Sequence, residues 1–502
     1  MELLSAAQIR EWDAFTCQHQ HITSWQLMER AAQACLQWLD SHEYLSRTFL
    51  IFCAKGNNGG DGLALARLLR QKNVVLSVYI LESDSKGSGD FQSNLSWLKE
   101  TSVPIHRIQS PDDFPFVDRQ VLVIDALYGS GLNRPLEGTA RALVDHLNKS
   151  GAGTISIDIP SGMFAGESAR TGSVIRALHT LTFQVFKIAF LVPENEENTG
   201  QVHVLEINLD PAFLDNLRSG FGLIDEQTIR LMYKPRKPFS HKGTYGHALL
   251  VAGSWGKMGA AVLCSHSCLR SGVGLLSCHV PRCGYDILQT AVPEAMLLVD
   301  PQPNQVTKLQ EDLSKFDALG LGPGLGTGEE TAKVLAAVLQ QYKKPVVIDA
   351  DALNILSRNQ HLYASIPAFS ILTPHPKEFE RLFGATGNDF ERLNLALQKA
   401  RELKVIIVLK GHHTFVAMPG GKGFFNMTGN AGMATGGSGD VLTGLLTGLL
   451  AQKYQPAEAA LLGVYLHGLA GDLAAAEISR EALLASDITA HLGKAFLCVQ
   501  QL

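Results

Sequence analysis

Residues 48–69 read TFLIFCAKGNNGGDGLALARLL, and this stretch decides the fold class of the first half of the chain. It begins with the unbroken apolar run Thr48–Ala54, continues through a loop with four glycines and ends in an apolar segment with helical spacing. Apolar runs without alternation are typical of parallel strands that are buried on both faces. A strand, a glycine-rich loop and a helix in this order predict a βαβ unit.

The same pattern recurs along the chain. Amphipathic stretches such as Ser24–Leu39 and Gly62–Leu69 supply the crossover helices. Twelve further strands are predicted at Val74–Leu81, Val121–Asp125, Thr154–Ile159, His179–Val185, Val202–Ile207, His247–Ala252, Gly274–Val280, Ala318–Leu321, Pro345–Asp349, Phe369–Leu372, Val405–Lys410 and Thr414–Ala417. The pattern lapses in the stretch Asp210–Pro238, which contains Pro211, Pro235, Pro238 and the short basic run Lys234–Lys237, and a new series starts at Lys242. We therefore predict two three-layer α/β/α domains, residues 1–215 and 241–502, joined by a linker at 216–240.

Composition narrows the class of protein. The chain has 502 residues, 46% hydrophobic and 18% charged, so a sizeable core can form. The net charge is -5 and no basic block is present, which argues against nucleic-acid binding. Eight cysteines without a CxxC spacing make no disulfide framework, and irregular spacing disfavours zinc at Cys264, Cys268, Cys278 and Cys283. The longest apolar helix candidate, Val441–Ala451, is well short of the roughly 20 residues that span a membrane, so we expect no membrane association and a cytoplasmic protein.

The first glycine loop, Lys55–Gly62, has the features of an anion site. Four glycines let the backbone approach a ligand, and the following helix adds its positive end. Two later strands end in Asp125 and Asp158, which should face the same crevice, because ligands of open α/β sheets bind beyond the carboxyl ends of the strands. Asn58, Asp125 and Ser161 offer oxygen ligands for a hard cation, and Asp158 is a candidate proton carrier. A turn or helix-cap role for either aspartate stays open.

Three motifs, GNNGGDG at 56–62, DALYGSGLNRPLEG at 125–138 and DIPSG at 158–162, together resemble the NAD(P)H-hydrate epimerase family. The resemblance covers about residues 1–215 and implies a Rossmann-like domain with potassium held by Asn58, Asp125 and Ser161. It implies that the hydrated dinucleotide binds at Asn57, Asn58, Gly59, Gly60, Asp61, Gly129, Ser130, Gly131, Leu132, Asn133, Arg134, Pro135 and Asp158. The family usually has a Gly/Pro-Lys element where this chain has Val185-Phe186-Lys187, so the role of Lys187 is left open.

The strongest segment of the second half is NAGMATGGSGDVLTG at 430–444. Its glycine-rich backbone leads into an apolar helix, whose N-terminus should form an anion hole. Asp440 at that mouth could hold Mg²⁺ or accept a proton from a hydroxyl that attacks phosphorus; an acidic helix cap is the structural alternative. Further candidate elements follow predicted strands at Lys257–Ala261, Gly320–Gly328, Asp349–Asp351, Pro374–Glu378 and Lys410–Thr414. Together they indicate a phosphoryl-transfer cleft.

The 430–444 segment resembles the signature of ADP/ATP-dependent NAD(P)H-hydrate dehydratases, which have a ribokinase-like fold. The resemblance covers about residues 225–500. It implies that ADP binds at Lys410, Gly411, His412, His413, Thr414 and Gly439, and that the hydrated dinucleotide contacts Ala260, Gly322, His375 and Asp440. Related sugar and vitamin kinases often carry Asn where this chain has His375, which favours a dehydratase over a plain kinase.

The two resemblances together imply a bifunctional repair enzyme, an isomerase fused to a lyase. It would epimerise the R and S forms of NAD(P)H hydrate and dehydrate the S form to NAD(P)H with ADP as co-substrate, giving AMP and phosphate. Asp158 and Asp440 are the expected catalytic residues, with K⁺ in the epimerase domain and Mg²⁺ in the dehydratase domain. We also expect a homo-oligomer. The alternatives are an ATP-dependent kinase of a small alcohol with an accessory nucleotide-binding domain, and a non-catalytic nucleotide sensor, which would gain nothing from acids beside phosphates.

Overall fold

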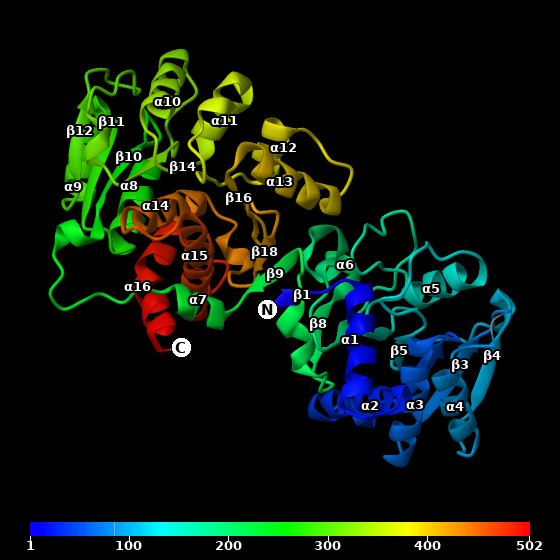
Figure 1. Cartoon of the computed structure of the whole chain (residues 1–502). Coiled ribbons are helices and arrows are strands. Elements are labelled where there is room, and N and C mark those ends of the chain that lie inside the picture. The colour runs from blue at the N-terminus through cyan, green and yellow to red at the C-terminus, as the bar shows by residue number, and fades with distance from the viewer. Residues whose placement is uncertain (85, 502) are drawn as a thin grey trace. The chain divides into compact units, whose positions relative to one another are not determined.

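The computed structural model describes residues 1–84 and 86–501, and the chain divides into two compact α/β units (Figure 1). The N-terminal unit comprises residues 3–219 and 388–390, and the C-terminal unit comprises residues 1–2, 220–387 and the chain from Glu391. The division at 219/220 lies inside the segment 216–240 that we expected to be a linker. Much of that segment is ordered structure of the C-terminal unit, however, because it contains strand β9 (Phe221–Ile224) and helix α7 (Glu226–Met232).

The N-terminal unit is built on a fully parallel sheet with the order β4-β3-β2-β5-β6-β7-β8 among the described residues. Its strands are β2 (Phe49–Cys53), β3 (Leu76–Leu81), β4 (Ile105–Ile108), β5 (Leu122–Ala126), β6 (Gly153–Ile157), β7 (His179–Phe183) and β8 (Gln201–Leu205). The chain order reverses between β2 and β5, and a reversal of this kind opens a crevice at the carboxyl ends of the strands.

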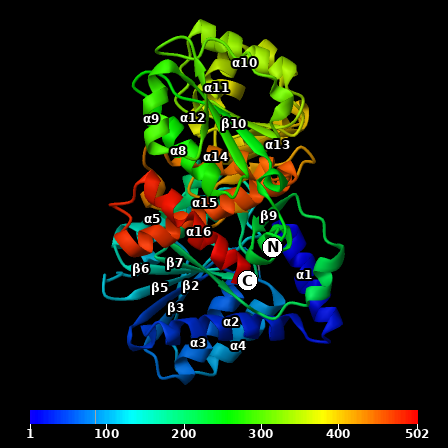
Figure 2. The ribbon, with the colours of Figure 1, turned by 90° about the vertical axis from the view of Figure 1, so that its left-hand side faces the viewer.

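Helices cover both faces of this sheet, as Figure 2 shows. The helices are α1 (Ala6–His19), α2 (Ser24–Ser41), α3 (Asn57–Gln71), α4 (Gly89–Lys99), α5 (Gly138–Ser150) and the short α6 (Glu196–Thr199). One apolar core lies between the sheet and α2, α3 and α4, and a second lies between the sheet and α5. Strands buried on both faces explain why the sequence shows unbroken apolar runs here.

The sheet of the C-terminal unit is mixed, with the order β1-β9-β18-β17-β16-β15-β14-β13-β10-β11-β12 among the described residues. Neighbours from β12 to β16 are parallel, whereas β17 runs antiparallel to both β16 and β18. The other strands are β1 (Glu2–Leu3), β10 (His247–Val251), β11 (Leu275–Pro281), β12 (Met296–Asp300), β13 (Ala318–Leu321), β14 (Val346–Ile348), β15 (Ile371–Leu372), β16 (Ile406–Leu409), β17 (Phe415–Ala417) and β18 (Gly423–Asn426).

One large apolar core joins this sheet to α8, α14, α15 and α16. The helices of the unit, besides α7, are α8 (Met258–Arg270), α9 (Tyr285–Ala291), α10 (Glu329–Gln341), α11 (Ala350–Arg358), α12 (Pro376–Phe383), α13 (Asp389–Leu403), α14 (Ser438–Ala451), α15 (Pro456–Ile478) and α16 (Ala485–Gln501). Helices α10 to α13 lie together at the other side of the sheet (Figure 1). Helices on both sides of the sheet confirm the predicted three-layer α/β class.

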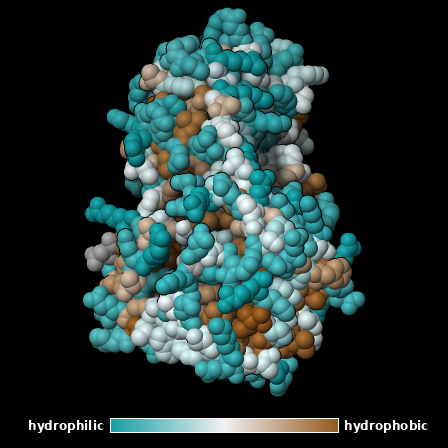
Figure 3. Space-filling model, turned by 90° about the vertical axis from the view of Figure 1, so that its right-hand side faces the viewer, coloured by the Kyte–Doolittle hydropathy of each residue, from teal (hydrophilic) through white to brown (hydrophobic). Residues whose placement is uncertain are grey.

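The expectation that the stretch within 441–451 is the longest apolar helix is wrong. Helix α15 has 23 residues and, in the described chain, is long and apolar enough to cross a membrane by length and composition. However, 67% of its most apolar window is buried within the protein, as expected for a core helix. On the face drawn in Figure 3, hydrophilic side chains predominate and apolar ones lie in scattered patches.

All thirteen predicted strands are present, but the start of α3 differs from the prediction. The GNNGGDG motif is not a loop before the helix, because α3 begins at Asn57, directly after its N-cap Gly56. A Cβ on Gly59 would lie 1.7 Å from the Ala54 carbonyl oxygen, and one on Gly62 would lie 2.5 Å from the Ala126 side chain. These glycines therefore let the first turns of α3 pack directly against the sheet.

Candidate functional site

The N-terminal unit contains a cleft of about 770 Å³ at the carboxyl ends of its strands. Ten of the thirteen residues predicted to bind the dinucleotide line it: Asn57, Asn58, Asp61, Gly129, Ser130, Gly131, Leu132, Asn133, Arg134 and Asp158. Gly59, Gly60 and Pro135 do not. Gly59 faces the Ala54 backbone and Gly60 faces the Met28 side chain, so these two glycines shape the helix rather than the cavity wall.

Asp158 lies in this cleft directly after β6, in the left-handed backbone region with φ +67°. Its Oδ1 is 2.8 Å from Nζ of Lys187, and its Oδ2 accepts a 2.8 Å hydrogen bond from the Ser130 amide. Burial alone would raise the pKa of Asp158, but the Lys187 charge and the hydrogen bonds from Lys187 and Ser130 lower it below its usual value. The structure thus places Lys187, whose role the sequence left open, in direct contact with Asp158.

Helix α1 brings charged residues to the cleft that the sequence analysis missed. Arg10 and Asp13 lie three residues apart on this helix, and both line the cavity. Burial, followed by repulsion from Asp158, raises the pKa of Asp13 to about 6, although Lys187 lowers it. The pKa of Asp61 is also raised well above its usual value, first by burial and then by Asp158 and Asp13. No motif marks α1, so the sequence carried no signal for these two residues.

The residues expected to hold potassium are Asn58, Asp125 and Ser161. The Ser161 hydroxyl donates to Asp125 Oδ1 over 2.6 Å, and the Ser161 amide donates to Asp125 Oδ2 over 2.9 Å. Asp125 is fully buried, and none of the ion pairs found among the described residues includes it. The Asn58 side-chain oxygen and nitrogen are buried without a hydrogen-bond partner in the described chain. A buried carboxylate that has no cationic partner, and a buried amide oxygen that has no hydrogen-bond partner, are suitable ligands for a monovalent cation.

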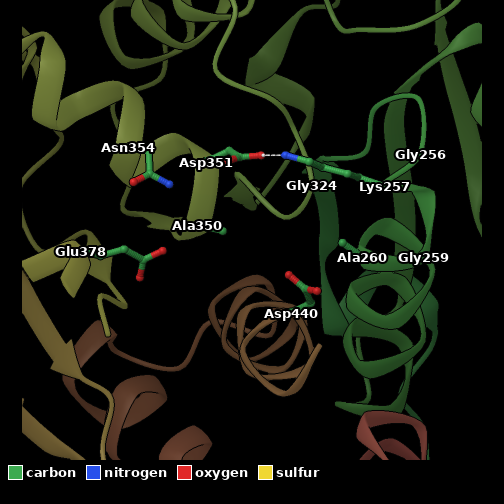
Figure 4. Close-up of a pocket in the computed structure, with 10 residues that line it drawn as sticks. All are labelled: Gly256, Lys257, Gly259, Ala260, Gly324, Ala350, Asp351, Asn354, Glu378 and Asp440. Carbon is green, nitrogen blue, oxygen red and sulfur yellow. Dashed lines mark hydrogen bonds and ion pairs between the residues drawn. The ribbon is translucent and has the colours of Figure 1, made fainter. Parts of the chain in front are cut away.

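The C-terminal unit has a second cleft, of about 420 Å³, also at the carboxyl ends of parallel strands (Figure 4). Its wall contains Gly256, Lys257, Gly259, Ala260, Gly324, Ala350, Asp351, Asn354, Glu378 and Asp440. Lys257 Nζ contacts Asp351 Oδ2 at 3.1 Å, and Glu378 and Asp440 reach in from the facing helices α12 and α14. Of the predicted dinucleotide contacts, Ala260 and Asp440 line this cavity; Gly322 and His375 do not.

Helix α14 points its uncapped N-terminus at this region. Its N-cap is Gly437, with φ +93° and no side-chain hydrogen bond to the helix amides. Asp440 lies in the first turn, so the alternative in which it is the helix cap is wrong. A Cβ on Gly439 would be 3.2 Å from Nζ of Lys410, which places the lysine ammonium beside these amides. Free amides and an adjacent cation form an anion site.

Lys410 is held by a buried carboxylate. Its Nζ is 2.8 Å from Asp349 Oδ1, while Thr443 donates to Asp349 Oδ2 over 2.7 Å. A Cβ on Gly322 would be 1.9 Å from the Asp349 carbonyl oxygen, so Gly322 supports this arrangement by close packing. The sequence analysis noted Asp349 only as a strand-end acid, and the structure shows that it positions the lysine.

Asp440 has an electrostatic environment suited to a base near neutral pH. Burial, followed by the negative charges of Asp349 and Asp351, raises its pKa to about 7, and Lys410 opposes this rise. A carboxyl with a pKa near the working pH can both take and release a proton.

The remaining predicted residues lie on two loops around this site. His375 is the N-cap of α12: its Nδ1 accepts hydrogen bonds from the Lys377 and Glu378 amides at 3.1 and 3.4 Å. Burial and the Lys410 charge lower its pKa. Gly411, His412, His413 and Thr414 form the turn between β16 and β17, directly after Lys410. Burial and the neighbouring His412 lower the pKa of His413 to about 4, so its imidazole is neutral.

Within residues 1–84 and 86–501, no group of three or more His, Cys, Asp or Glu side chains is arranged to hold a metal ion. The four cysteines considered for zinc therefore form no such centre, and Cys264, Cys268 and Cys278 are buried in the core. A divalent ion in the second cleft would have to be held partly by its ligand's phosphates, as is usual for Mg²⁺.

The fold and the two clefts define an α/β enzyme with two separate nucleotide-type sites. A sequence profile of NAD(P)H-hydrate dehydratases matches residues 248–494, and a profile described as YjeF-related protein N-terminus matches residues 24–189. The bifunctional NAD(P)H-hydrate repair enzyme of Moorella thermoacetica is 34% identical over 97% of this chain and 95% of its own length. That of Escherichia coli is 35% identical over 94% of this chain and 89% of its own. The chain belongs to the family of bifunctional NAD(P)H-hydrate repair enzymes.

A solved structure resembles the second half. It is the ADP/ATP-dependent NAD(P)H-hydrate dehydratase of Bacillus subtilis, co-crystallised with ATP and Mg²⁺. The two proteins are 34% identical with a TM-score of 0.49, and the match covers 55% of this chain and 98% of the Bacillus chain. The relatives and the two matched domains confirm the predicted bifunctional epimerase and dehydratase. The alternative of a small-alcohol kinase finds less support.

Proposed function

We propose that the second cleft dehydrates the S form of NAD(P)H hydrate with ADP as co-substrate, and that Asp440 is its base. The observation that carries the proposal is the position of Asp440, whose pKa is about 7, in the first turn of the uncapped helix α14 and near Lys410. Hydroxide is a poor leaving group, so the C6 hydroxyl of the hydrated ring must be activated. Asp440 accepts the hydroxyl proton while the oxygen attacks the terminal phosphorus of ADP and AMP leaves. Phosphate then leaves C6 as C5 loses a proton, which restores NAD(P)H.

The phosphate charge is met by groups of this chain. Lys410 and the first amides of α14, including that of Gly439, face the transferring phosphoryl group, and their fixed positions stabilise its charge. The turn Gly411–Thr414 follows Lys410 and supplies the rest of the ADP contacts. Asp351 and Glu378 lie across the cleft from Asp440 and would hold Mg²⁺ together with the phosphates (Figure 4). When bound, Mg²⁺ neutralises phosphate charge.

The first cleft interconverts the two epimers in this proposal. Asp158, which Lys187 and Ser130 keep ionised, acts as the base that accepts a proton during inversion at C6, and the residues 129–134 contact the dinucleotide. K⁺ would be held by Asn58, Asp125 and Ser161 and would order the adjoining loop, because Tyr128 donates its amide to the Ser161 hydroxyl over 2.8 Å. A homo-oligomer and a cytoplasmic location stay predictions of the sequence.

A product analysis tests this function. Purified protein is given a mixture of R and S NADH hydrate with ADP and Mg²⁺, and NADH is followed at 340 nm while AMP and phosphate are quantified. Both epimers should be consumed, with one AMP and one phosphate per NADH. The variant Asp440→Asn should stop NADH formation but leave epimerisation intact. A stable phosphorylated small molecule, or no turnover of either epimer, would contradict the proposal.

A further inference from the structure

Charged residues of both signs line the cleft of the N-terminal unit. Its cations are Arg10, Lys55 and Arg134, and its acids are Asp84 and a group of three, Asp13, Asp61 and Asp158, with Lys187 paired to Asp158. Arg10 Nη1 is 4.0 Å from the place that a Cβ on Gly131 would take, so α1 lies against the 129–135 loop. A dinucleotide has an anionic diphosphate and an uncharged reduced ring. The arginines suit the diphosphate, and the acids suit the ring.

Asp13 differs from the other two acids in origin. It comes from α1, which precedes the stretch 24–189 matched by the N-terminal profile, whereas Asp61 and Asp158 come from α3 and the end of β6. Asp13 therefore enters the cleft from a separate element, close enough to Asp158 and Lys187 for both charges to act on its carboxyl. The other titratable groups near Asp13 are Asp61 on α3 and Cys17 one turn further along α1.

We propose that Asp13 is the proton donor of the epimerase cleft, acting on one face of the hydrated nicotinamide ring while Asp158 acts on the other. The proposal rests on the epimerase function proposed above and adds a residue to it. Asp13 titrates near pH 6, so a useful fraction is protonated in neutral solution, while Asp158 stays ionised. Two carboxyl groups whose pKa values are pushed apart in one site make an acid and a base.

The step balances without any oxidant or reductant. Asp13 donates its proton to the C6 hydroxyl, the C6–O bond breaks, and water leaves. The lone pair of ring N1 then forms a C6=N1 iminium, and the surplus of carboxylates around it stabilises the positive charge. A water molecule attacks C6 from the opposite face, the iminium electron pair returns to N1, and Asp158 accepts the proton released by that water. Solvent exchange returns the proton to Asp13.

Asp61 is the rival donor in the same cleft. Burial, followed by the charges of Asp158, Asp13 and Asp90, raises the pKa of Asp61 well above its usual value. The two donors are distinguished by substitution: if Asp13 is the donor, the pH dependence is lost in Asp13→Asn and kept in Asp61→Asn.

The experiment measures epimerisation alone, by chromatographic separation of R and S NADH hydrate in the absence of ADP, from pH 5 to 8.5. Wild-type kcat/KM should fall about tenfold per pH unit above pH 6, because the acid form of Asp13 is lost. Asp13→Asn should lower kcat about 10²–10⁴-fold, with a much smaller change in KM, and should abolish the pH dependence. Glu11→Gln, the same change on an exposed side chain of α1, should match wild type.

A second readout follows the oxygen. In ¹⁸O-enriched water the wild type should introduce one labelled oxygen per epimerisation, because the C6–O bond breaks. Three results would each overturn the assignment. The first is epimerisation without incorporation of label, and the second is an unchanged pH profile in Asp13→Asn. The third is that Asp61→Asn, instead of Asp13→Asn, lowers kcat and abolishes the pH dependence. A wild-type enzyme that does not interconvert the epimers would instead refute the epimerase function itself. Hydrogen exchange of the amides of α1 and β6, measured on the same samples, shows that the N-terminal unit of each variant is folded, and dehydration of the S form with ADP shows the same for the C-terminal unit.

Discussion

The dehydratase should lose activity on acidification through Asp440, at a pH near 7 instead of near the usual carboxyl value. Burial and the charges of Asp349 and Asp351 raise the pKa of Asp440 from 3.8 to about 7. A base must be ionised to act, so activity is present above this pKa and is lost as the pH falls through it. A group with a pKa of about 7 is about 9% ionised at pH 6 and about 91% at pH 8, so kcat/KM should change about tenfold over that interval.

Substitution of Lys410 should shift this pH dependence. Lys410 is the positive charge that opposes the rise in the pKa of Asp440. Lys410→Met should therefore shift the acidic limb of the pH profile, the range in which activity falls with falling pH, to higher pH. Lys410→Arg keeps the charge and should leave the limb near its wild-type position, although it alters phosphate contacts. The terminal phosphate of ADP titrates in the same range, but equally for every variant, so the comparison uses the shift between variants.

The assay is NADH formation at 340 nm from S NADH hydrate, at substrate concentrations well below KM, because kcat/KM reports the free enzyme. Asp440→Asn should lower kcat/KM about 10²–10⁴-fold and remove the limb. An identical limb in Lys410→Met and Lys410→Arg, or a limb that persists in the residual activity of Asp440→Asn, would refute the reasoning.

Three further predictions follow from contacts in the two clefts. Lys187→Met should lower the free energy of unfolding of the N-terminal unit by about 3–5 kcal/mol at pH 7, because it leaves the Asp158 carboxylate unpaired. The control Lys149→Met, on an exposed side chain, should change this free energy little. Hydrogen exchange of the amides measures the unfolding free energy of both variants. Adding Asp158→Asn to Lys187→Met should recover much of that loss, and simple additivity would contradict the ion pair. Gly439→Ala should raise KM for ADP about tenfold or more without lowering Tm, because the added methyl group would fill the space beside Lys410. The control Gly493→Ala, on α16, should change neither KM nor Tm. An unchanged KM in Gly439→Ala would show that Gly439 is not part of the ADP site. Replacing K⁺ by tetramethylammonium should slow epimerisation but not dehydration, and equal epimerisation rates in both salts would contradict the potassium site.

The central strands of both sheets could be predicted from sequence because burial on both faces leaves unbroken apolar runs. The missed strands lack that signal. In β4 and β12, at the edges of their sheets, only Ile108 and Asp300 are buried. β9 and β18 are four-residue strands that contain glycine, and β1 has two residues. The supposed linker was misassigned for the same reason: β9 is short, and it gains stability by pairing with the distant strand β18.

Some features of the candidate sites depend on neighbouring residues in the sequence, and others depend on residues that are distant in the sequence. Motifs such as GNNGGDG and GGSGD are local, because a helix N-terminus and its preceding turn are made by consecutive residues. Glycines were interpreted from sequence as ligand contacts, and the structure shows that Gly59 of the first motif and Gly322 of the 320–328 loop also face backbone carbonyls at distances that admit no side chain. A glycine motif indicates close approach but does not say whether the approaching atom belongs to a ligand or to the chain.

Protonation states depend on distant information altogether. Asp158 follows the end of β6 and Asp13 lies on α1, and in the sequence both are simply aspartates. The pKa of Asp158 is nevertheless lowered, whereas that of Asp13 is raised to about 6. The difference comes from Lys187, which is 29 positions from Asp158 in the chain and 2.8 Å from its carboxylate. Only folding pairs that lysine with Asp158 and leaves Asp13 buried and repelled by the Asp158 carboxylate. Which of the two aspartates acts as the acid and which as the base is therefore decided by the assembled cleft. Moving the contact of Lys187 from Asp158 to Asp13 should exchange their roles.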